Sequence, residues 1–157
     1  MTTYQWLLGL HVLAAFLFVS GGVMVGLVHG AAVRSTRPSD VAQLLGLARI
    51  GVLIVLAGAI GSLVLGLALV AHLSYRELGD TWIALSLLLW TVAILLGAVG
   101  GRSARRTRYL AEKLAAEGDQ PSADLRRALT DPMAFALNYG SMLAALAVLA
   151  LMFWKPA

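Results

Sequence analysis

Four long stretches of the chain are strongly apolar and carry no charged side chain. They are residues 1–33, 50–75, 81–101 and 132–154. Each is longer than the roughly 18 apolar residues that signal a membrane-spanning helix. The pattern therefore predicts an all-α protein, a polytopic bundle in one membrane domain over residues 1–157. Its four transmembrane helices are expected at about 4–33, 40–73, 81–117 and 132–154.

The polar connections contain signals for helix ends. Ser39 or Asp40, directly after Pro38, is expected to cap the second helix, because short polar side chains accept hydrogen bonds from the first free amides. Asp131 followed by Pro132 is expected to begin the last helix, since proline suits the first helical position.

The third helix is expected to continue beyond the membrane. Good helix formers run from Arg102 to Glu117, and Gly118 follows as a terminator. We therefore expect a cytoplasmic extension of this helix, and then a short helix at about 122–130.

Basic residues are divided unequally between the two sides of the membrane. Ten of the twelve Lys and Arg lie in connections 34–49 and 102–131, and the other two are Arg76 and Lys155. By the positive-inside rule, both connections are cytoplasmic and both termini lie outside. Aromatic residues, which collect at headgroup level, gather at the ends that this topology makes external: Tyr4, Trp6, Tyr75, Trp82 and Trp154.

The composition excludes several classes of protein. Hydrophobic residues make up 60% of the chain and charged residues 13%, whereas soluble domains carry about a quarter charged residues. The net charge of +4 is accounted for by basic residues facing an anionic inner leaflet, so a lipid bilayer is the expected partner and nucleic acid is not. Without cysteine, the chain has no disulfide, thiolate metal site or thiol nucleophile.

Glycines mark the faces where helices are expected to touch. Gly22 and Gly26 form a G-x-x-x-G in the first span, and Gly58, Gly61 and Gly66 lie in the second. Small residues let helix backbones approach closely in lipid. These faces are expected to pack the bundle or to bind a partner.

Histidine is the one strongly polar side chain with coordinating chemistry inside the spans. His11 lies five residues after Trp6, and His72 lies three residues before Tyr75, which places both rings within one helical turn of the same depth. Neutral imidazole is a common metal ligand. We expect His11 and His72 to bind a cofactor in one outer cavity, with Met152 as a further candidate metal ligand.

Other polar residues have structural interpretations. His29, five residues before Arg34, is expected at the inner interface. Interhelical hydrogen bonds are expected for Asn138, Tyr139 and Ser141 of the last span, and for Trp90 and Thr91 of the third. No Asp, Glu, Lys or Arg lies inside a span, which counts against ion-coupled transport.

Three segments together resemble a known family. They are Leu10-His11-Val12-Leu13-Ala14-Ala15 with Gly21-Gly22, the basic Arg105-Arg106-x-Arg108, and Leu151-Met152-Phe153-Trp154-Lys155-Pro156. They are similar to the uncharacterised bacterial four-helix membrane proteins of domain-of-unknown-function family 2269, which resembles the copper-resistance CopD-like group. The resemblance implies a compact helical bundle in the bacterial inner membrane, with an inward-facing His11.

Three functions are compatible with these features. The leading hypothesis is a bundle that binds b-type haem or copper near the outer face and serves electron transfer. The alternative is a non-catalytic accessory or assembly subunit of a larger membrane complex, or a homo-oligomer. The third is transport of a small molecule by an oligomer. No catalytic residue is predicted.

Overall fold

The computed structural model describes residues 2–72 and 81–154, and within them the only regular elements are helices. Tyr75, Arg76 and Lys155 lie outside the described residues. The helices are α1 (Thr3–Arg34), α2 (Pro38–His72), α3 (Thr81–Ala116), α4 (Ala123–Leu129) and α5 (Pro132–Trp154). Four segments are long and apolar enough to cross a membrane: α1, α2, α3 and Ala123–Trp154. The prediction of an all-α chain with four spans is confirmed.

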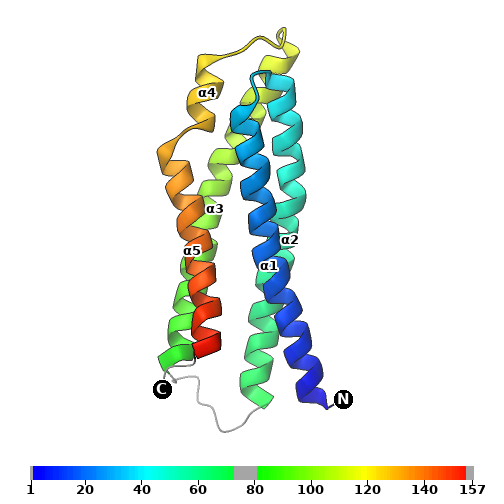
Figure 1. Cartoon of the computed structure of the whole chain (residues 1–157), viewed down its shortest axis with the longest axis vertical. Coiled ribbons are helices and arrows are strands. Elements are labelled where there is room, and N and C mark those ends of the chain that lie inside the picture. Colours follow the sequence, from blue (N-terminus) through cyan, green and yellow to red (C-terminus); the bar gives the residue numbers. More distant parts are fainter. Residues whose placement is uncertain (1, 73–80, 155–157) are drawn as a thin grey trace.

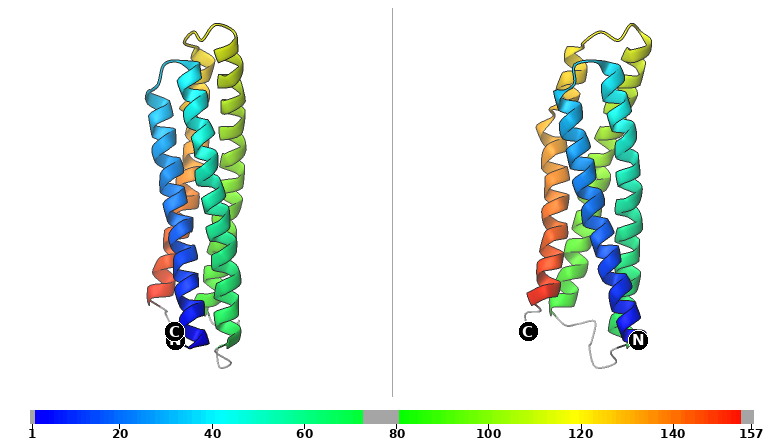
Figure 2. Two further views of the ribbon diagram at one scale, coloured as in Figure 1. Left: turned by 90° about the vertical axis from the view of Figure 1, so that its right-hand side faces the viewer. Right: turned by 45° about the vertical axis from the view of Figure 1, so that its right-hand side comes forward.

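The long helices form two closely packed pairs. α1 packs along α2, α3 packs along α5, and α2 and α3 join the pairs (Figures 1 and 2). The short α4 and the turn between α1 and α2 lie together at one end of the bundle, called here the α4 end. The start of α1 and the end of α5 lie at the opposite end, called here the Trp154 end.

The close contact between α1 and α2 depends on glycines, which have no side chain to separate the two backbones. A Cβ at Gly58 would collide with the backbone of Phe18 and would lie 2.7 Å from the Ala14 carbonyl oxygen. A Cβ at Gly21 would lie 2.8 Å from the backbone nitrogen of Val55. The two backbones therefore touch directly, as expected where packing rather than hydrophobic burial drives association.

The glycine face of α1 that makes this contact differs from the predicted one. Gly22 faces α5, where a Cβ would lie 3.2 Å from the Met142 sulfur, and a Cβ at Gly26 would meet no described atom within 4 Å. One residue along a helix is a rotation of about 100°, which is enough to move Gly22 off the α2 side that Gly21 occupies. The expectation that Gly26 packs within the bundle is wrong.

The α4 end holds a hydrophobic core of ordinary type. Helices α1, α2, α3 and α4 all contribute to it. Leucine and valine side chains are buried there, whereas the contacts between α1 and α2 deeper in the spans use glycine and alanine. The buried residues of the core at the α4 end are Ala32, Val41, Leu45, Ala111, Leu125 and Leu129.

The N-terminus of α2 is capped by a residue far along the chain. Ser39 donates two hydrogen bonds to the Asp119 carboxylate, from its backbone nitrogen and from its hydroxyl, each 2.7 Å long. These bonds, with the positive charge of Arg37, hold the pKa of Asp119 below its ordinary value. The α2 helix begins at Pro38, so the expectation that Ser39 or Asp40 supplies its N-cap is wrong.

The C-terminus of α1 is capped in the same way. Arg126 of α4 donates a hydrogen bond from its guanidinium to the backbone carbonyl of Val33. An anion at the start of α2 and a cation at the end of α1 both complement the helix dipoles. Asp119, in the connection between α3 and α4, and Arg126 of α4 thus bind the two helix ends that flank the turn between α1 and α2.

Three other helix ends follow local sequence signals. Pro132 is the first residue of α5, and the Asp131 carboxylate accepts from the Met133 amide at 3.0 Å, as predicted. Thr2 and Gln5 form a reciprocal capping box at the start of α1. After α3, Gly118 adopts a φ of +117°, which favours glycine.

We predict that Gly58→Ala destabilises the protein, because the new methyl group must push α1 away from α2. The expected cost is about 1–3 kcal/mol, typical of overpacking. The matched control is Gly26→Ala, where the methyl group meets open space. Thermal unfolding in detergent measures both, and equal transition temperatures for the two variants would contradict the close contact.

A second prediction concerns Asp119. Because its folded pKa is lowered, its contribution to stability is present above the pKa of the unfolded chain and is lost as the pH falls through the folded value. Hydrogen exchange of residues 34–45, corrected for intrinsic rates, should therefore rise on acidification. In Asp119→Asn, exchange should be raised already at neutral pH. Asp124→Asn, which removes an exposed carboxylate paired with Arg127, should behave as the native protein; a rise equal to that of Asp119→Asn would refute the cap.

Candidate functional site

His11 lies between α1 and α2. Its side chain is buried, with 8% of the residue exposed. A Cβ at Gly66 of α2 would lie 3.1 Å from the imidazole Cε1 and 3.4 Å from Nδ1. The absence of a side chain at Gly66 is therefore what leaves room for the imidazole.

The buried ring has an unsatisfied nitrogen. The Ser62 carbonyl lies near the ring, yet no group in the described part of the chain offers Nδ1 a hydrogen bond of acceptable geometry. The Ser62 hydroxyl is already engaged, because it donates to the Ala59 carbonyl at 3.0 Å. A buried polar atom without a partner costs free energy, and in hydrocarbon the cost is several kcal/mol. Nδ1 of His11 is therefore a candidate ligand atom.

His72 is placed differently from His11. It is the last described residue of α2 and is exposed. It follows Gly66, the neighbour of His11, by six residues, which is a rise of about 9 Å along α2. The two histidines are therefore separated by more than one helical turn, rather than matched in depth.

Met152 lies near the depth of His11 but on another helix pair. Counting from the contact between Gly22 and Met142, it is ten residues towards the Trp154 end, and His11 is eleven. However, α1 and α5 stand apart at this end in Figure 1 and in the right-hand view of Figure 2. Across residues 2–72 and 81–154, no group of three or more His, Asp or Glu side chains could hold a metal ion.

His29 occupies a junction that the sequence did not reveal. Its Nε2 lies 3.3 Å from the Leu129 carbonyl oxygen at the end of α4, and its ring meets Phe135 edge-on with 5.2 Å between centroids. The sequence indicated an interfacial position for His29 but gave no sign of these two contacts. Because α4 has only seven residues, its position against α1 leaves no periodic signal.

Polar residues of α5 make contacts with α3. The Ser141 hydroxyl donates to the Ala93 carbonyl at 2.7 Å, which confirms the interhelical hydrogen bond expected there. Asn138 packs against Gly100, where a Cβ would collide with the amide oxygen. On α3, the indole nitrogen of Trp90 is buried and, within the described chain, has no hydrogen-bond partner.

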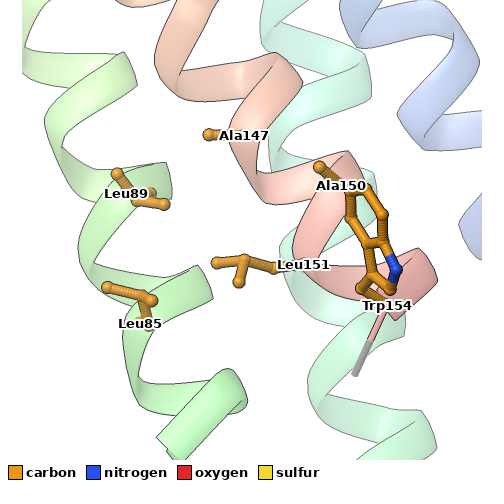
Figure 3. A pocket seen from close by; sticks show the side chains of 6 residues that line it. All are labelled: Leu85, Leu89, Ala147, Ala150, Leu151 and Trp154. Carbon is orange, nitrogen blue, oxygen red and sulfur yellow. The ribbon is translucent and has the colours of Figure 1, made fainter. Parts of the chain in front are cut away.

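An apolar groove lies between α3 and α5 near the Trp154 end. Figure 3 shows its side chains projecting from the two helices, and its volume is about 460 Å³. Trp154, one of its lining residues, is 83% exposed. With an almost entirely apolar lining, the groove suits an acyl chain or aliphatic side chain. The lining residues are Leu85, Leu89, Ala147, Ala150, Leu151 and Trp154.

Comparison with known proteins identifies a family and nothing narrower. No curated protein and no solved structure matches the chain. A family model described as a predicted integral membrane protein (DUF2269) matches residues 5–156. The match covers all four candidate spans, the buried His11 and the α4 end. The chain therefore belongs to the DUF2269 family of predicted integral membrane proteins.

Proposed function

We propose that this protein is a non-catalytic subunit that assembles, within the membrane, with a transmembrane helix of a partner protein. The observation that carries the proposal is the uncovered glycine face of α1. A Cβ at Gly26 or Gly30 would meet no described atom within 4 Å, although Gly22, Gly26 and Gly30 recur every four residues.

The spacing of these glycines supports a helix as the occupant. Glycines four residues apart lie on one face of a helix and form the small-xxx-small surface that allows close backbone approach. Each glycine inside a helix costs about 0.8–1.0 kcal/mol relative to alanine. The bundle itself uses Gly21 for its contact with α2, so a partner helix accounts for glycine at positions 26 and 30.

The surroundings of the glycine face also favour a helix partner. Leu27, beside Gly26, is 71% exposed, and Val23, one turn earlier, is also exposed. The face therefore combines a shallow glycine surface with projecting aliphatic side chains, which can interdigitate with those of a second helix.

Cross-linking from this face tests the proposal. Since the chain has no cysteine, Leu27→Cys gives a unique attachment site for a photoreactive probe. In native membranes it should yield an adduct with another protein, and Gly26→Leu in the same background should reduce that adduct severalfold. Leu53→Cys, equally lipid-exposed on α2, is the matched control and should label lipid.

Two other results would overturn the accessory role. An adduct of twice the chain mass would show self-association in place of a separate partner. Labelling of lipid alone from Leu27→Cys would show that the glycine face is not an interface.

We also propose that the protein lies in a bacterial inner membrane with both termini outside and the α4 end in the cytoplasm. The support is the ten-to-two division of Lys and Arg together with the aromatic residues near the Trp154 end.

A reporter active only outside the cytoplasm tests this orientation. Fused after Ala157, it should be active, and inserted at Gly118, it should be silent. The reverse pattern would show that the bundle has the opposite orientation in the membrane.

A second candidate function is binding of b-type haem or copper through His11 for electron transfer, as in the wider CopD-like group that the sequence resembles. The observation in its favour is the unsatisfied buried Nδ1. The fit is incomplete, because the exposed His72 lies about 9 Å further along α2 and Met152 belongs to the diverging α5. This candidate therefore requires a second ligand from another molecule or a movement of α5.

Absorption spectra and metal analysis test the second candidate. Protein expressed with haem and copper supplied should carry one of them, and His11→Ala should lose it while His29→Ala retains it. Colourless, metal-free native protein would exclude this function and would leave the assembly proposal unaffected.

A further inference from the structure

Four arginines mark the boundary between the apolar spans and the α4 end. Arg49 directly precedes the charge-free run of α2, and Arg102 directly follows the charge-free run of α3. Arg105 and Arg106 lie about one helical turn beyond Arg102. All four side chains are exposed. We call them the boundary arginines.

The boundary arginines lie within one short section of the bundle axis. Leu45 of α2 and Ala111 of α3 share the hydrophobic core of the α4 end. Arg49 is four residues, or about 6 Å, from Leu45 towards the spans, and Arg105 is six residues, or about 9 Å, from Ala111 in the same direction. Arg106 and Arg102 are five and nine residues, or about 8 and 14 Å, from Ala111. Since α2 and α3 pack side by side, the four positions therefore fall within about 8 Å of one another along the bundle axis.

The carboxylates that form ion pairs at the α4 end pair with cations other than the boundary arginines. Further from the spans, Arg108 pairs with Glu112 at 3.1 Å, and Lys113 pairs with Glu117 at 3.8 Å. In α4, Arg127 pairs with Asp124 at 3.8 Å. Within residues 2–72 and 81–154, no carboxylate forms an ion pair with a boundary arginine.

The charges are therefore sorted by depth along α3. Beyond the boundary, the cations are neutralised by carboxylates three or four residues away, as on an ordinary solvated helix. At the boundary itself, positive charge is left unpaired at the ends of the apolar runs, the depth at which lipid headgroups are expected. Guanidinium groups bind phosphate oxygens through paired hydrogen bonds, which makes arginine suited to phosphate recognition.

We propose that the boundary arginines form a binding site for the phosphodiester headgroup of an anionic phospholipid. The depth of the site favours lipid over a soluble anion, because the boundary arginines lie at the ends of both apolar runs. The site is independent of the glycine face of α1 and of His11.

Lipid competition tests the proposal with the full-length protein. Protein in nanodiscs that contain phosphatidylcholine and a minority of phosphatidylglycerol is released into the gas phase, and native mass spectrometry counts the lipids retained. The native protein should retain phosphatidylglycerol in excess of its share. Arg102→Gln/Arg105→Gln should lower that excess severalfold, and Arg49→Gln should lower it less.

The matched control is Lys113→Gln/Arg127→Gln, which also removes two positive charges from exposed positions at the α4 end. It should keep the preference for phosphatidylglycerol. Added glycerol phosphate should fail to compete, since a soluble phosphate ester lacks the acyl chains that hold the headgroup at the boundary.

Three outcomes would overturn the site. Equal loss in the two double variants would mean that net charge alone attracts the lipid. An unchanged preference in both Arg102→Gln/Arg105→Gln and Arg49→Gln would place the lipid elsewhere. Displacement by glycerol phosphate would indicate a soluble anion as the ligand. Circular dichroism of each variant verifies that the helices are intact.

Discussion

Inside a bilayer, two apolar helices gain little by leaving lipid for each other, so their association depends on how closely their backbones approach. In this protein, that approach is set by Gly58 of α2 against Phe18 of α1 and by Gly21 of α1 against Val55 of α2. The contact fixes the rotation of α1. As a consequence, His11 faces Gly66, while a Cβ at Gly26 would meet no described atom within 4 Å.

A different force holds the α4 end. Beyond the boundary arginines, the helices carry charged side chains suited to water, and in water burial of Val41, Leu45 and Leu125 in a common core is favourable. The same chain thus uses close backbone contact in its spans and a conventional hydrophobic core outside them. Exposed leucines in the spans and buried leucines at the α4 end are both expected from these two environments.

Features that depend on local composition could be predicted from the sequence. The four spans, the continuation of α3 and the start of α5 at Pro132 follow from hydropathy, charge and capping residues. The sequence could not predict that Gly21, and not Gly22, contacts α2, because this depends on a rotation of α1 by a fraction of a turn. Asp119 as the cap of α2 was also beyond local signals, because Ser39 lies 80 residues away.

The candidate site likewise has some features that could be predicted from the sequence and others that could not. A polar His11 inside the first span was evident from the sequence, and the structure buries it. Counting residues from Trp6 and Tyr75 predicts similar depths for His11 and His72. This count assumes that the two aromatic residues lie at the same level, and the sequence does not give the register of α1 against α2. The register seen at Gly66 corrects that estimate. The contact of His29 with Leu129 and Phe135 depends on the docking of α4, which its seven residues do not encode.

The caps supplied by Asp119 and Arg126 bear on how the protein is made. They bind the two helix ends that flank the turn between α1 and α2, across sequence separations of 80 and 93 residues. During synthesis, α1 and α2 can enter the membrane and pair long before these two side chains leave the ribosome. The Ser39 amide and the Val33 carbonyl therefore lack these two partners until α3 and α4 have been translated. The α4 end can therefore be completed only after Arg126 of α4 has been synthesised, which makes it a late step in biogenesis.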